Sequence, residues 1–215
     1  MCKSISRILF FLLILQSGKA QWLPKRDWLI EPITDQVTID SAKGQLVFSN
    51  GLVRRSFLLQ PNFSCVDFLN LSTGQQLLRS IEPEASVTLN GVEYRVGGAG
   101  GQKEKAYWQP SFANRLTISD SDFRYKRLFT KTIESRMKGV NNYPAPKGIE
   151  LVCVYAASLP ALQGIEVQVH YALYQGLPLI EKWVTLQNNS SNTIHLNRVV
   201  HEILGLVEEE SAVVG

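Results

Sequence analysis

The chain has 215 residues, and its 22 lysine and arginine residues outnumber its 19 acidic residues by three. Three basic residues, Lys3, Arg7 and Lys19, lie in an N-terminal segment with the features of an export signal, so the rest of the chain carries 19 charges of each sign. A net charge near zero provides no basic surface for nucleic acid and no polybasic patch for a membrane. The composition therefore excludes electrostatically driven binding of either kind.

The first 20 residues are ordered like a secretory signal peptide. After the basic start, residues 8–15 (ILFFLLIL) are apolar, and small residues around Lys19 offer a cleavage point. A run of this length falls far short of the ~20 residues that span a bilayer. We therefore expect a secreted or periplasmic protein, free of the membrane after cleavage, with one folded domain over residues 21–215.

Two Asn-Gly pairs predict tight β-hairpins. Asn50-Gly51 stands within GQLVFSNGLVRRSFLL, and Asn90-Gly91 stands within SVTLNGVEYRV. A two-residue type I′ turn needs positive φ at both positions, which Asn and Gly adopt readily. Between the hairpins, FSCVDFLNLSTGQQLL predicts a strand, a Ser-Thr-Gly turn and a second, short strand.

The stretch 96–112 (VGGAGGQKEKAYWQPSF) is glycine-rich, then charged, then aromatic. It predicts a long loop, and long loops in compact domains are often functional. Strands follow at 123–130 (FRYKRLFT) and 149–157 (IELVCVYAA), with the Pro/Gly/Asn loop 138–148 between them. No window of eleven or more residues has a helical stripe, and the best candidate, 201–215, is short and interrupted by a glycine.

The last third of the chain predicts a strand register. The strand IEVQVHYALY alternates apolar and polar residues, and the strand after QGLP places Trp183 on the face opposite its apolar residues. With turns at 175–178 and 188–192, antiparallel pairing puts Trp183 between His170 and Asn197.

Many short strands with turn signals between them, and no alternation of strands with helices, predict an all-β protein. The expected fold is an antiparallel β-sandwich.

Cys65 and Cys153 remain once the signal segment is removed. Each stands among apolar residues, and buried cysteine behaves as a small hydrophobic residue. Two buried thiols are the preferred interpretation, and a single disulfide formed in an oxidising compartment is the alternative. The chain has no CxxC pair and no Cys/His cluster, so we expect no metal site and no cofactor.

Three histidines, His170, His195 and His201, leave two interpretations of the polar residues open. His170 and His195 on one sheet face suggest a metal or acid–base site, whereas a histidine on a strand without coordination spacing is more often hydrogen-bonded or solvated. Glycoside hydrolysis requires two carboxylates on opposite sides of a cleft. The sequence indicates no such partner for the pairs Glu82/Glu84 and Asp120/Asp122. We therefore assign no catalytic residue.

The aromatic residues are the better candidates for ligand binding. Tyr107 and Trp108 in the long loop and Trp183 on the polar face can stack on sugar rings, with His170 and Asn197 beside Trp183 as hydrogen-bonding groups. The alternative is that these rings fill a second packing layer or a domain seam. The candidate carbohydrate-binding residues are thus Tyr107, Trp108, His170, Trp183 and Asn197.

Three motifs together resemble a known domain. They are the hairpin Asn50–Phe57 (NGLVRRSF), the strand pair Pro83–Gly91 (PEASVTLNG) and the strand pair Val169–Asn188 (VHYALYQGLPLIEKWVTLQN). Their order resembles the N-terminal β-supersandwich of α-galactosidase-like glycoside hydrolases of the family 36 type, which has a galactose-mutarotase-like fold. The similarity covers most of residues 40–200.

The resemblance implies an accessory role. In that family a (β/α)₈ barrel follows the supersandwich and carries the catalytic aspartates, so no catalytic residue of the family has a position in this chain. We expect a supersandwich that is incomplete at Gly215, with carbohydrate or a catalytic barrel domain as its partner. Open sheet edges would also favour self-association. The alternatives are a mutarotase-type sugar epimerase using His170 or His195 with a glutamate, or a purely structural interaction module.

Overall fold

A computed structural model describes residues 27–31, 33–134 and 146–206 of the chain. The predicted signal segment and most of the predicted loop 138–148 lie outside these residues, so both stay predictions. The described strands are β1 (Thr38–Ala42), β2 (Gln45–Ser49), β3 (Val53–Leu58), β4 (Ser64–Asn70), β5 (Gln75–Gln76), β6 (Leu78–Ser80), β7 (Ala85–Leu89), β8 (Val92–Val96), β9 (Arg124–Thr132), β10 (Gly148–Ala156), β11 (Ile165–Tyr174), β12 (Ile180–Asn188), β13 (Leu196–Val200) and β14 (Gly205–Leu206). Two short 3₁₀ helices complete them, η1 (Pro110–Arg115) and η2 (Pro160–Leu162).

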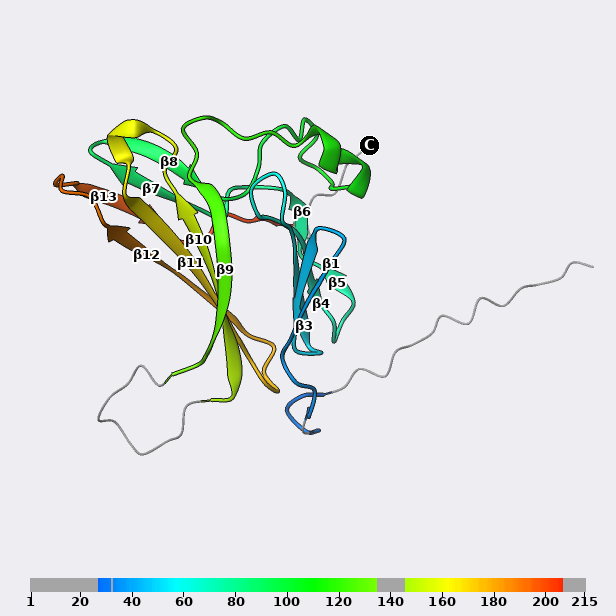
Figure 1. The fold of residues 1–215 in the computed structure, drawn as a ribbon. Coiled ribbons are helices and arrows are strands. Elements are labelled where there is room, and N and C mark those ends of the chain that lie inside the picture. The colour runs from blue at the N-terminus through cyan, green and yellow to red at the C-terminus, as the bar shows by residue number, and fades with distance from the viewer. Residues whose placement is uncertain (1–26, 32, 135–145, 207–215) are drawn as a thin grey trace, which may run out of the picture.

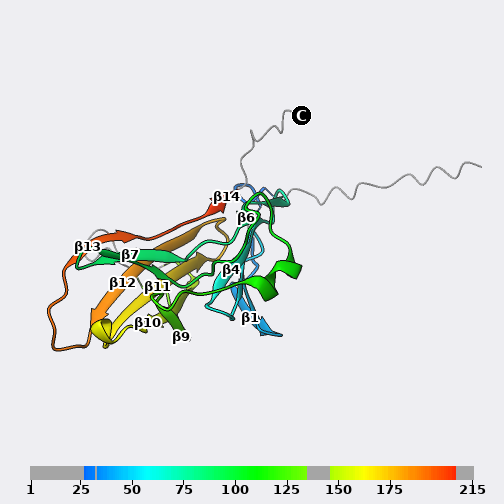
Figure 2. The same ribbon diagram turned by 90° about the horizontal axis from the view of Figure 1, so that it is seen from above.

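The strands form four antiparallel sheets. Their orders are β1-β2-β3-β4-β5, β12-β11-β10-β9, β13-β7-β8 and β14-β6. The five-stranded sheet faces the four-stranded sheet, and the three-stranded sheet lies beside the latter (Figures 1 and 2). The predicted all-β antiparallel sandwich is confirmed, and the described part of 201–215 forms β14 rather than a helix.

Both predicted hairpins are present, but the first turn is centred on Gly51 and Leu52, and Asn50 does not have the positive φ expected of it. Asn90 and Gly91 have φ of 50° and 81°, and they join β7 to β8. Asn50 is buried, and its side-chain oxygen accepts from the backbone N–H of Leu52 and Val53, both at 3.0 Å. Its side-chain nitrogen donates to the carbonyls of Tyr174 (2.7 Å) and Leu177 (2.6 Å). Asn50 therefore shapes its own turn and also ties the first hairpin to the end of β11.

Strand β11 shows why the sheet forms as predicted. Val167, Val169, Tyr171 and Leu173 alternate along it, and all are fully buried in the main core. Strand β12 pairs with β11 in the predicted register, with Trp183 opposite His170. A one-residue slip would turn the whole apolar row to the wrong face, so the alternation specifies this register strongly.

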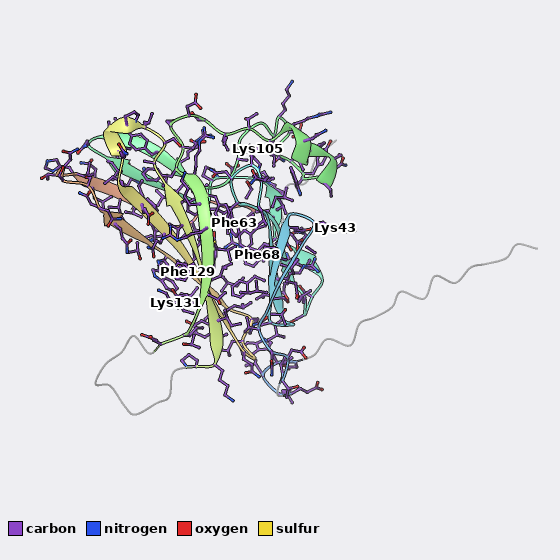
Figure 3. All side chains as sticks on the ribbon, viewed as in Figure 1. Lys43, Phe63, Phe68, Lys105, Phe129 and Lys131 are labelled. Atoms are coloured by element: carbon purple, nitrogen blue, oxygen red, sulfur yellow. The ribbon has the colours of Figure 1, made fainter. Side chains whose placement is uncertain are left out.

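The main core lies between the two larger sheets. Phe57 on β3 stacks on Phe63, with ring centroids 4.7 Å apart, and meets the tilted ring of Tyr171 at 5.2 Å. Figure 3 shows Phe63 and Phe68 in the space between the sheets. These rings join the first half of the chain to the last third.

Cys65 and Cys153 are both buried and free. The preferred interpretation, two thiols rather than a disulfide, is confirmed. Burial raises the pKa of both thiols and also that of the Tyr155 and Tyr171 hydroxyls. All four groups are therefore neutral in the folded protein at moderately alkaline pH.

The raised pKa values predict a loss of stability as the pH rises. The unfolded chain releases thiol protons above about pH 9, whereas the folded chain retains them, so the unfolded state is favoured progressively. We expect the free energy of unfolding to fall by about 1–3 kcal/mol between pH 8.5 and 10. Urea unfolding followed by circular dichroism measures this fall, and Cys153→Ala should reduce it. A constant free energy over this range would contradict the prediction.

Candidate functional site

The predicted long loop borders three cavities of the protein. Its first residue, Val96, ends β8; after it the loop has no regular structure, apart from an isolated bridge between Gly100 and Thr117, until η1 begins at Pro110. Buried Gln102 holds the loop in place. Its side-chain oxygen accepts from Ile81 N–H (2.8 Å), and its nitrogen donates to the carbonyls of Glu104 and Tyr107 at 2.6 Å and 2.9 Å. This one amide therefore positions the residues just before Trp108.

Trp108 lines a groove on the outer face of the five-stranded sheet. The groove has a volume of about 490 Å³. We call it the Trp108 groove; its lining is Gln45, Val47, Arg54, Ser56, Val66, Asp67, Gln76, Trp108 and Pro110. The indole is half-buried because it packs against the small cluster of Val66, Ile81 and Ala99. The ring of Phe112 supports it edge-on, with centroids 6.0 Å apart.

A hydrogen-bonded network forms the polar side of the Trp108 groove. Asp67 accepts from Arg54 Nε at 2.8 Å, from Ser56 Oγ at 3.3 Å and from Gln76 Nε2 at 2.6 Å. These contacts hold planar polar groups in place beside an aromatic ring. The described lining contains one carboxylate, Asp67, and so does not present the carboxylate pair that glycoside hydrolysis uses.

Tyr107 lies next to Trp108 in sequence but lines a different cavity. This cavity has a volume of about 220 Å³ and includes Phe112 and Arg115 in its lining. Tyr107 is 49% exposed, and its ring centroid is 5.7 Å from that of Phe112. The two neighbouring aromatic residues therefore do not form one platform.

His170 and Trp183 meet on the outer face of the four-stranded sheet, as predicted. Their rings stack with centroids 4.7 Å apart and an interplanar angle of 10°. His170 Nδ1 lies 2.8 Å from Glu150 Oε1, and Nε2 lies 2.9 Å from the Thr185 hydroxyl. His170 is only 5% exposed, so its ring is engaged on both nitrogens and largely covered.

A basic residue borders this face. Lys131 and Phe129 lie on β9 (Figure 3), and Lys131 Nζ is 5.4 Å from the Phe129 ring centroid and 3.9 Å from Glu150 Oε1. The Glu150 carboxylate beside His170 therefore also has a cationic neighbour.

Asn197 does not lie beside Trp183, so this part of the register prediction was wrong. Strand β13 pairs with β7 in a different sheet, because the chain leaves the four-stranded sheet after β12. The Asn90-Gly91 turn holds it there: Asn197 Oδ1 accepts from Gly91 N–H at 2.8 Å, and His195 N–H donates to Asn90 Oδ1 at 2.9 Å. Asn197, the expected neighbour of Trp183, is therefore a contact of the second hairpin.

Sequence reasoning missed a buried ion cluster of Arg55, Glu84, Lys182 and Glu202. Arg55 Nη1 lies 2.9 Å from Glu202 Oε2, and Lys182 Nζ lies 2.6 Å from Glu202 Oε1 and 3.6 Å from Glu84 Oε2. The side chains of Arg55, Glu84 and Lys182 are at most 5% exposed. The cluster joins β3 and β12 to the segments that precede β7 and follow β13.

The alternation of core-facing and outward-facing residues along β3 and β12 already indicated this cluster. Arg55 stands between Val53 and Phe57 on β3, and Lys182 stands opposite Tyr171 in a row of core-facing residues. A charge at a core-facing position is buried only with partners. Burial alone would raise the pKa of Glu202, but Arg55 and Lys182 hold it below its usual value. Burial lowers the pKa of Lys182, which the two carboxylates only partly offset.

Within the described residues, no group of three or more His, Cys, Asp or Glu side chains is arranged to hold a metal ion. Among the helices in that part of the chain, none is both long and apolar enough to cross a membrane.

The fold and site define an antiparallel β-sandwich with a polar, aromatic-edged groove. No protein-family model matches the sequence, and no curated protein matches it. A solved structure that is similar is the GH36 α-galactosidase AgaB from Geobacillus stearothermophilus, with 16% sequence identity and a TM-score of 0.44. The match covers 74% of this chain and 23% of that one, so this chain spans less than a quarter of the α-galactosidase.

Proposed function

We propose that this chain is an exported, non-catalytic carbohydrate-binding β-sandwich of the accessory type found in α-galactosidase-like glycoside hydrolases. The observation that carries the proposal is the Trp108 groove, where a half-buried indole stands beside the fixed Arg54–Asp67–Gln76 network. The order of the sequence motifs supports the accessory type, and the apolar segment 8–15 supports export.

The groove suits a sugar for two physical reasons. The C–H face of a pyranose ring packs on an apolar aromatic surface, and planar polar side chains around that surface bond the ring hydroxyls. Its volume of about 490 Å³ also falls within the range of small-molecule sites. Asp67 can accept hydrogen bonds from hydroxyl groups, and the Arg54 guanidinium and Gln76 amide can donate hydrogen bonds to them.

Trp108→Ala should weaken sugar binding by at least about tenfold, because removing one buried aromatic contact costs on the order of 1–3 kcal/mol. Isothermal titration calorimetry with galactose, glucose and their short glycosides measures the affinity. Trp183→Ala is the matched control, since it removes an indole from the opposite side of the sandwich, and it should leave the affinity unchanged.

The other outcomes of this titration point to different functions. If only Trp183→Ala abolished binding, the sugar would lie on the His170 face and the groove assignment would be wrong. If the unmodified protein bound no sugar, an interaction module would replace the proposal.

The His170–Glu150 pair, at 2.8 Å, is the observation that favours a mutarotase-type enzyme instead. That function requires His170 to reach a sugar ring. The imidazole of His170 is stacked on Trp183, however, and the residue is only 5% exposed. Polarimetry of the purified protein with α-galactose separates the two functions, since only an enzyme accelerates the interconversion of anomers.

A further inference from the structure

A second cleft lies between the outer face of the β7–β8 hairpin and the glycine-rich stretch 97–101. Its volume is about 610 Å³. We call it the glycine cleft; its lining is Glu82, Pro83, Ser86, Glu93, Arg95, Ala99, Gly100, Gly101, Gln102, Lys105 and Ile203. We propose that the glycine cleft binds a polyhydroxylated carboxylic acid such as a hexuronic acid unit.

Arg95 is the charged group that the glycine cleft offers to a ligand. Lys105 already donates to Glu82 Oε1 and to the carbonyl of Ile81, both at 2.8 Å. Glu93 accepts from the hydroxyl of Ser86 at 2.7 Å. Over the described ranges, by contrast, no hydrogen bond or ion pair engages the Arg95 guanidinium.

The backbone positions the Arg95 guanidinium inside the cleft. Arg95 lies on β8 opposite Ser86 of β7, so a paired strand fixes its backbone. A Cβ atom added to Gly100 would lie 3.9 Å from Arg95 Nη1, which places the guanidinium against the glycine-rich stretch. Figure 3 shows Lys105 on the loop that continues from this stretch. Arg95 is exposed, so its charge lines the cleft and is also accessible from solvent.

Glycine allows the stretch 97–101 to pack closely against the segment that precedes β7. Gly98 has a φ of +65°, and a Cβ there would lie 2.3 Å from the carbonyl oxygen of Glu82. The stretch can approach the β6–β7 connection this closely only without a side chain at that position. Pro83, Ala99 and Ile203 supply apolar wall on which the C–H groups of a sugar ring can pack.

The arrangement of charges selects the ligand. A guanidinium binds a carboxylate through two parallel hydrogen bonds, which favours a planar anion. Glu82 and Glu93 in the same lining can accept hydrogen bonds from hydroxyl groups, and their negative charge disfavours anions of higher charge such as phosphate. A ligand with one carboxylate and several hydroxyls satisfies both conditions. The cleft volume of about 610 Å³ lies in the range typical of small-molecule sites.

The test is calorimetric titration of the full chain with galacturonate and glucuronate, with galactose as the uncharged comparison. We expect uronate binding that Arg95→Gln weakens by at least tenfold. Gly100→Leu, which fills the cleft without changing its charge, should also abolish binding. Gly100 does not have a positive φ, and an added Cβ meets only ordinary contacts there, so this second variant can fold. Circular dichroism during urea unfolding verifies the fold of each variant.

The matched control is Arg198→Gln, which removes the same charge from β13 of the same sheet, outside the described lining of the cleft. It should bind uronate like the unmodified protein, as should Trp108→Ala. The inference is overturned if the unmodified protein binds no uronate, or if Arg95→Gln binds it normally. It is equally overturned if Arg198→Gln weakens binding as much, or if Trp108→Ala alone abolishes it. None of these results depends on neutral-sugar binding in the Trp108 groove.

Discussion

Glu84→Ala should lower the free energy of unfolding by about 3–5 kcal/mol, because it removes the more deeply buried of the two carboxylates in the ion cluster. The residue is 2% exposed. Its carboxylate accepts from Cys65 N–H at 2.6 Å and from the Tyr171 hydroxyl, and it lies 3.6 Å from Lys182 Nζ. Alanine leaves a backbone amide and a hydroxyl without their acceptor, and it removes one of the two carboxylates beside a buried ammonium group.

Urea unfolding followed by circular dichroism measures the effect. Glu84→Gln retains an acceptor oxygen but loses the charge, so its loss of stability should lie between that of alanine and zero. Asp40→Ala is the control, since it removes an exposed carboxylate from β1 and should change the free energy by no more than about 0.5 kcal/mol. A loss below about 1 kcal/mol for Glu84→Ala would show that the ion cluster does not stabilise the sandwich.

Phe57→Ala should have an effect of similar size, about 3–5 kcal/mol, for a different reason. Phe57 is completely buried between the two larger sheets, where it contacts the rings of Phe63 and Tyr171. Truncation removes the favourable burial of the ring and leaves a cavity that two rigid sheets cannot close. Both halves of the chain line this cavity, so the loss should appear in the single cooperative unfolding transition.

Two further substitutions calibrate the Phe57 result in the same urea experiment. Phe57→Leu keeps most of the volume and should cost about 1–2 kcal/mol. Phe112→Ala removes a half-buried ring from η1 at the edge of the fold, and its cost should be about 1 kcal/mol. Equal losses for Phe57→Ala and Phe112→Ala would contradict a core position for Phe57.

The alternation of residues predicted local strands well because each strand carries that information in itself. The row Val167, Val169, Tyr171 and Leu173 specified the strand, and with the turn at 175–178 it specified the pairing with β12, since a one-residue slip would turn the row away from the core. The prediction was wrong for β13. The step from one sheet to another depends on where a neighbouring hairpin lies, and Asn90 supplies that contact from 105 residues earlier in the chain.

The candidate sites, like the strands, depended partly on local sequence and partly on contacts between distant segments. The sequence pointed to Trp108 through the composition of its loop, and it placed His170 opposite Trp183 through the period of two residues. It could not assign Arg54, Asp67 or Gln76 to Trp108, because β3, β4 and β5 meet the loop only in the folded sandwich. Arg95 and Gly100 likewise come together only through the fold.

The sequence by itself determined the fold class, the hairpins at Asn50 and Asn90, and the pairing of His170 with Trp183, because these depend on residues close together in the chain or on a simple period. The tertiary structure alone decided which sheet received β13, which charges share the core and which polar groups face each cavity. Those outcomes depend on contacts between distant segments. For Arg55 and Lys182, sequence and tertiary structure each supplied a part. Their places in apolar rows of the sequence show that they need partners, and only the packed sheets identify Glu84 and Glu202 as those partners.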